Sequence, residues 1–150
     1  MYVPWRRVAS WHCDACGICC YRYRVRLTFY EYLKLRPTGL VEEKFGRYYI
    51  RKIGGRCPFQ VGRLCSLQGV KKPAACKLFP FFVRRKGERD AFYEYNGEEF
   101  YVYISTDCPN VVLSRERRES KRVESLVREA VQLYTGEKRN VEFITAPTVV

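Results

Sequence analysis

Histidine is scarce in this sequence, and the residue groupings of familiar catalytic sites are missing. The 150 residues include one histidine, His12, and neither a glycine-rich phosphate loop nor a nucleophile–base pair accompanies it. Acid–base, nucleophilic and phosphoryl-transfer catalysis each need such groups placed together. The sequence therefore favours a binding or accessory protein over an enzyme.

Long hydrophobic runs are also missing. The longest uncharged aromatic run, Leu78–Val83, covers six positions and contains Pro80, whereas a membrane span needs roughly 18 or more apolar residues. The first residues offer no apolar stretch of about 7–15 residues after a basic start, as a secretory leader would. We expect a soluble, cytoplasmic protein with no membrane contact.

Material for a globular core is present. The chain is 47% hydrophobic and 15% aromatic, which excludes disorder as the main state. A chain of 150 residues is ordinary for one domain, so we expect a single domain over 1–150. Nineteen arginines against nine lysines, with three asparagines and three glutamines, give the basic chain a thermophile-like composition.

Local patterns near the N-terminus predict a strand followed by a short helix. Apolar residues alternate with Arg22, Arg24 and Arg26, which is the two-residue period of a half-buried strand. Thr28 and Glu31 stand at the spacing of a capping box, so a helix is expected over 29–36. One face of the predicted strand then carries only guanidinium groups.

The second half of the chain predicts a sheet and a helix. Three aromatic and β-branched segments, 81–85, 92–95 and 100–104, read as an antiparallel meander, and Asn96-Gly97 is a strong hairpin signal between the last two. Apolar residues then recur at helical spacing from Val123 to Tyr134, and a helix is expected over about 114–135. We expect an α+β fold with a small antiparallel sheet, a C-terminal helix and cysteine-rich loops around metal centres.

Eight cysteines are the most informative feature, because reduced compartments favour metal binding or catalysis over disulfides. Four of them form one tight group, Cys13, Cys16, Cys19 and Cys20. Two cysteines separated by two residues can turn both thiolates onto one metal ion. With a third cysteine the group matches the run that holds a cubane cluster in bacterial ferredoxins, whose fourth ligand is a remote Cys-Pro. Adjacent side chains diverge, so Cys20 suits a second centre or the opposite side of the first.

The other four cysteines are widely spaced, and Cys57 and Cys108 are each followed by proline. Eight thiolates divide into two sets of four, and sulfur ligation excludes magnesium and calcium. Because only one paired knuckle is present, iron–sulfur clusters are favoured over zinc, and the spacing favours the [4Fe-4S] type; disulfides or free thiols are the third alternative. The predicted ligands are Cys13, Cys16, Cys19, Cys20, Cys57, Cys65, Cys76 and Cys108.

Arginines form the other candidate site. The net charge of +12 favours polyanions as neighbours, and the predicted contacts are Arg22, Arg24, Arg26, Arg84 and Arg85. A solvated surface explains the same residues. The arginines could also neutralise thiolate charge. Each four-thiolate site that holds a 2+ ion or cluster carries about two negative charges, so two such sites would lower the effective charge from +12 to about +8.

The cysteine motifs also carry a resemblance to a known family. The group from Cys13 to Cys20, Cys57-Pro-Phe, Cys65-Ser-Leu and the segment 72–81 around Cys76 resemble the YkgJ-type cysteine-cluster family, a zinc- or iron-chelating domain. The resemblance covers roughly 13–109 and implies that the shared cysteines carry metal. Related cysteine clusters accompany iron–sulfur-dependent protein methylation factors, which implies a protein partner.

Three functions remain open from the sequence. The leading hypothesis is an iron–sulfur protein with an accessory, electron-transfer or metal-handling role. The second is a zinc-stabilised module that contacts RNA or a ribonucleoprotein through its basic face. The third is a cluster-bearing partner of a protein-modifying methyltransferase.

Overall fold

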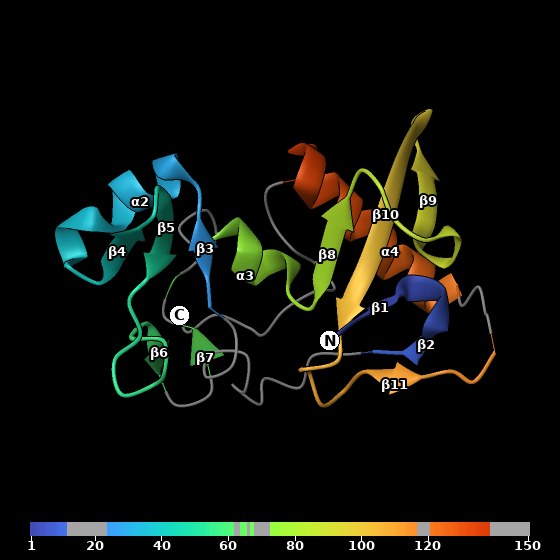
Figure 1. Cartoon of the computed structure of the whole chain (residues 1–150), viewed down its shortest axis with the longest axis horizontal. Helices are drawn as coiled ribbons and strands as arrows, with labels where there is room; N and C mark the ends of the chain where they lie inside the picture. Colours follow the sequence, from blue (N-terminus) through green and yellow to red (C-terminus); the bar gives the residue numbers. More distant parts are fainter. Residues whose placement is uncertain (12–23, 62–63, 66, 68–72, 117–120, 139–150) are drawn as a thin grey trace. The chain divides into compact units, whose positions relative to one another are not determined.

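The computed structural model describes residues 1–11, 24–61, 64–65, 67, 73–116 and 121–138. The chain forms two compact units (Figure 1), one comprising Met1–Asp14 and Leu78–Thr145, the other Ala15–Lys77 and Ala146–Val150. Each unit combines antiparallel strands with helix around its own hydrophobic cluster. The predicted α+β class is confirmed. The prediction of one domain over 1–150 stays a prediction.

The first unit is built on a four-stranded antiparallel sheet whose central strand is β10 (Glu98–Ser105). Strand β9 (Phe92–Tyr95) joins it through the predicted Asn96-Gly97 turn, in which both residues have positive φ. The other two partners of β10 are β1 (Tyr2–Pro4) and β8 (Phe81–Arg84).

The predicted meander is wrong in strand order, because β8 pairs with β10 and not with β9. The connection after β8 passes against β10. There the backbone amide of Glu88 donates a hydrogen bond to the Tyr103 hydroxyl at 2.7 Å, and a Cβ at Gly87 would collide with the same hydroxyl. A short 3-10 helix, η4 (Arg89–Ala91), then leads into β9 on the other side.

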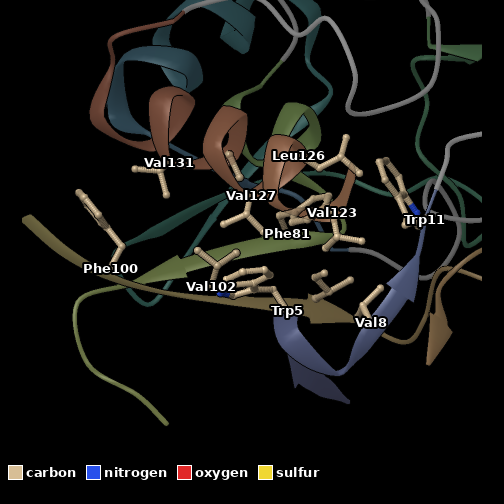
Figure 2. Close-up of a cluster of buried hydrophobic side chains, with 12 residues drawn as sticks. Trp5, Val8, Trp11, Phe81, Phe100, Val102, Val123, Leu126, Val127 and Val131 are labelled. Carbon is tan, nitrogen blue, oxygen red and sulfur yellow. The ribbon is translucent and has the colours of Figure 1, made fainter. Parts of the chain in front are cut away.

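The C-terminal helix α4 (Lys121–Thr135) supplies the other half of the first core. Figure 2 shows its apolar residues facing aromatic and aliphatic side chains of the strands and of the N-terminal segment. A further 3-10 helix, η1 (Trp5–Arg7), and a small two-stranded sheet of β2 (Val8–Ser10) and β11 (Val112–Leu113) complete the unit. The buried helix residues are Val123, Leu126, Val127, Glu129, Ala130 and Val131.

The predicted start of this helix, at about residue 114, is too early. Ser114 uses its backbone amide to bond the Arg7 carbonyl at 2.7 Å, and its hydroxyl accepts from the Glu116 amide at 3.3 Å. Serine side chains that bond nearby backbone amides in this way favour turns over helix. Residues 114–116 are therefore outside the helix, and the described part of α4 begins at Lys121.

In the second unit the predicted capping box forms in full. Thr28 Oγ1 accepts from the Glu31 amide at 3.2 Å, and Glu31 Oε1 accepts from the Thr28 amide at 2.9 Å. Helix α2 (Phe29–Leu35) follows and tightens into the 3-10 helix η2 (Arg36–Thr38), which ends at Gly39 with φ 72°.

A three-stranded antiparallel sheet packs beside α2 in the order β3 (Arg26–Leu27), β5 (Arg47–Ile50), β4 (Val41–Lys44). The predicted alternation is confirmed for residues 24–27, with Val25 and Leu27 buried. The β4–β5 hairpin was not predicted. It turns at Phe45 and Gly46, both with positive φ, as a two-residue hairpin turn requires.

The second unit also contains the hairpin of β6 (Gln60–Val61) and β7 (Leu64–Cys65). The short helix α3 (Ala74–Leu78) follows, and the division between the two units falls after Lys77, near its C-terminal end. None of the helices in the described ranges has the length and apolar character of a membrane span.

Candidate metal centre

Cys57 lies in the hydrophobic cluster of the second unit. Gly54 and Gly55, with φ of 60° and 78°, form the turn before it, and Ile53 and Arg56 bridge that turn. The Cys57 side chain is 8% exposed and packs among apolar residues. A cysteine that had no role beyond packing would fit here, so the arrangement of the other cysteines decides its role.

The backbone brings Cys65 back towards Cys57. The Gln60 amide donates to the Cys57 carbonyl at 3.2 Å, which closes a turn at the start of β6. Gln60 is then the register partner of Cys65 across the β6–β7 hairpin. Two cysteines eight positions apart in sequence are thus held in one small hairpin.

Cys76 reaches the same hydrophobic cluster from helix α3. The amides of Cys76 and Lys77 both donate to the Pro73 carbonyl, at 3.0 and 3.1 Å, so proline sets the first turn of this helix. The Cys76 side chain is half-buried and packs against the cluster that contains Cys57. The structure therefore places the side chains of two predicted ligands, Cys57 and Cys76, in the same hydrophobic cluster. The register of the β6–β7 hairpin brings the backbone of a third, Cys65, back to the turn that Cys57 opens.

Two cations flank these cysteines in the sequence. Lys77 is 8% exposed and follows Cys76. Arg56 precedes Cys57, and its guanidinium donates twice to Gln60 Oε1, at 3.2 and 3.0 Å. Positive charge that approaches a cysteine sulfur stabilises thiolate over thiol, and both cations are sequence neighbours of predicted ligands.

Cys108 belongs to the first unit. It follows β10 and opens a turn in which the Val111 amide donates to its carbonyl at 3.3 Å. Its half-buried side chain packs against the first core, and the Trp11 indole Nε1–H donates to its Sγ at 3.2 Å. Trp11 is not among the predicted site residues, and its only signal in the sequence is its place two residues before Cys13.

The remaining predicted ligands, Cys13, Cys16, Cys19 and Cys20, lie outside the described residues. Among the residues that are described, no three His, Cys, Asp or Glu side chains gather closely enough to hold a metal ion. The candidate metal ligands among the described residues are cysteine sulfurs that lie in or against apolar clusters. Such donors fit zinc and iron and do not fit magnesium or calcium.

The predicted polyanion contacts divide into two groups. Arg24 and Arg26 are exposed in the second unit, Arg26 in β3 and Arg24 two residues before it, and Arg24 pairs with Glu42 at 3.7 Å. Arg84 and Arg85 are exposed in the first unit, where Arg85 lies 4.5 Å over the Phe100 ring and 3.9 Å from Glu98. Arg22 lies outside the described residues.

Comparison with models of protein families matches residues 12–109 to the family described as "CxxCxxCC: Putative zinc- or iron-chelating domain". The match covers more than half of the 150 residues and includes all eight cysteines. Searches of curated proteins and of solved structures return no match.

Proposed function

The chain belongs to the CxxCxxCC family of zinc- or iron-chelating domains, and on that premise we propose that its cysteines bind iron–sulfur clusters in an accessory, electron-transfer or metal-handling role. The proposal assigns Cys57, Cys65 and Cys76 to one centre. Its fourth thiolate comes from Cys16, Cys19 or Cys20, which fall in the same unit of the chain.

The observation that carries the proposal is the gathering of cysteines around the second hydrophobic cluster. Cys57 and Cys76 come from different elements and pack in the same cluster, and the hairpin register returns Cys65 to the turn that Cys57 opens. Cysteines that served packing alone would not need this convergence from a turn, a hairpin and a helix.

Iron–sulfur is preferred to zinc because of ligand spacing and environment. Small zinc domains usually repeat a paired knuckle, whereas here one close group is followed by three widely spaced cysteines before Cys108. When bound, a cluster supplies one-electron transfer at a potential set by burial, charge and hydrogen bonds to sulfur. The apolar cluster around Cys57 limits solvent access, and the indole of Trp11 donates a hydrogen bond to the Cys108 sulfur.

Anaerobic purification, visible absorption and metal analysis test the metal. We expect a brown protein that contains iron and acid-labile sulfide. A colourless protein with about two zinc ions per chain, unchanged by anaerobic reconstitution, would contradict the iron–sulfur proposal and support the zinc alternative.

Substitutions test the ligands. Cys57→Ser and Cys76→Ser should each remove about half of the iron, because each breaks one of two four-thiolate sets. Ala75→Ser is the matched control, since it places the same serine in the same helix next to Cys76 and removes no thiol. Full metal occupancy in both cysteine variants would refute the ligand assignment.

A further inference from the structure

The sheet of the second unit has one side turned to solvent. Alternate residues of a strand point to opposite faces, and Val25, Leu27, Val41 and Ile50 place one face in the hydrophobic cluster. The residues between them therefore form the opposite face.

That opposite face is strongly cationic. It carries five basic side chains and one acidic side chain, Glu42, and all five cations are exposed. The register places Arg26 and Glu42 on either side of Tyr49, and Lys44 opposite Arg47. We call these residues the cationic sheet face: Arg24, Arg26, Glu42, Lys44, Arg47, Tyr49 and Arg51.

Tyr49 forms the centre of the cationic sheet face. The Arg24 guanidinium lies 3.9 Å from the centroid of its ring and 3.7 Å from the Glu42 carboxylate. These two contacts hold the guanidinium in place, while its side chain remains 50% exposed. A guanidinium held on an aromatic ring offers N–H donors at its edge and a flat cationic surface for stacking.

We infer that the cationic sheet face binds single-stranded nucleic acid, with phosphates on the basic side chains and a base stacked at Tyr49 and Arg24. Neighbouring strands are about 4.8 Å apart, and alternate residues of a strand about 6.8 Å apart, so the cations form a grid along which a polyanionic backbone can run. A flat aromatic–arginine platform suits unpaired bases, whose faces are accessible, better than a duplex.

The inference is separate from the proposed function. No cysteine lies on the cationic sheet face, so metal content and nucleic-acid binding can be measured independently in each variant. An acidic protein segment or an anionic membrane would also be attracted to the cations, but neither supplies a base to the Tyr49–Arg24 stack.

Fluorescence anisotropy of a labelled 12-nucleotide single strand, measured with the metal-loaded full chain, tests the inference. Binding should weaken with salt with a log–log slope of about −2 to −3, the value for three or four neutralised phosphates on a single strand. Arg26→Ala with Arg47→Ala should weaken binding at least tenfold and reduce the slope by about 1.4. Lys44→Ala with Arg51→Ala is a second, independent pair on the same face.

Lys34→Ala with Arg36→Ala is the matched control. It removes the same charge from exposed positions on α2 and η2, and it should leave the affinity within about twofold. An equal loss in the control pair, or no loss in both sheet-face pairs at unchanged metal content and melting temperature, would overturn the inference.

Tyr49 separates base stacking from charge. Tyr49→Ala should weaken binding about fivefold to hundredfold, whereas Tyr49→Phe should retain it, because stacking on one aromatic ring contributes about 1–3 kcal/mol per base. Heparin and vesicles that contain phosphatidylserine carry no bases. If Tyr49→Ala leaves oligonucleotide affinity unchanged, or if heparin or the vesicles bind as tightly as the oligonucleotide, the face recognises charge alone and the inference fails.

Discussion

Tyr93 shows how one side chain connects the first core to pH. Its ring packs against that core and meets the Trp5 ring edge-on, with centroids 6.2 Å apart. Burial raises the pKa of the Tyr93 phenol above its usual value of 10.0, and the Arg128 guanidinium opposes this shift in part. The folded protein therefore disfavours the phenolate.

This raised pKa predicts a loss of stability in alkali. Below about pH 10 the phenol is protonated in both the folded and the unfolded state. Above that pH the unfolded chain loses the proton first, because the pKa of Tyr93 is higher in the folded state. The free energy of unfolding therefore falls with rising pH until the pH passes the folded-state pKa. Tyr93→Phe should make that fall shallower in urea unfolding measured from pH 9 to 11.5. Tyr2→Phe, on an exposed tyrosine, controls for the loss of a phenol. Parallel curves for wild type and Tyr93→Phe would contradict the prediction.

At the scale of single residues, the spacing of the cysteines in the sequence indicates which of them could bind metal, but it does not indicate which residues surround them. The contact of Trp11 with Cys108 joins residues separated by 97 positions, and no local pattern encodes such a contact. The same holds for Cys57 and Cys76, whose shared cluster depends on how the elements between them pack.

Among the elements, α2 depends on its N-terminal cap. Thr28→Ala removes the hydroxyl that accepts from the Glu31 amide, and we expect it to lower the free energy of unfolding by about 1 kcal/mol. Thr28→Ser keeps the acceptor and should lose only a few tenths. Urea unfolding followed by circular dichroism measures the difference. Equal stability of the alanine and serine variants would show that the capping box contributes nothing measurable.

Elements encoded by neighbouring residues were predictable, and elements that depend on distant pairing were not. The capping box at Thr28 and the Asn96-Gly97 hairpin each lie within a few residues, and both are confirmed. The pairing of β8 with β10 joins residues that are distant in sequence, and the segment that follows β8 contacts Tyr103. Residues 114–116 lie outside α4, where the Ser114 amide bonds the carbonyl of Arg7, a residue far away in sequence.

At the scale of the molecule, the two units differ in their expected dependence on metal. The first unit has the larger core of buried residues, whereas six of the eight cysteines fall in the sequence range of the second. A ligand that binds only the folded state stabilises it, so metal removal should weaken the second unit more than the first.

Hydrogen exchange read by mass spectrometry tests this difference. Anaerobic chelation should reduce the protection of β4 and β5 at least tenfold and that of β8 and β10 much less, because metal-binding free energy is folding free energy for a small ligated unit. The metal-loaded protein under the same conditions is the control. Equal loss in both units would show that they unfold together.

The position of the tryptophans has an optical consequence. Both tryptophans of the chain, Trp5 and Trp11, are 2% exposed and belong to the first unit, and the Trp11 indole touches the Cys108 sulfur. Zinc has a filled d shell and no redox chemistry, so it adds no absorption in the region of the indole emission. An iron–sulfur cluster absorbs in the region of that emission and quenches it. If Cys108 binds metal as proposed, intrinsic fluorescence of the unlabelled protein distinguishes an iron–sulfur cluster from zinc.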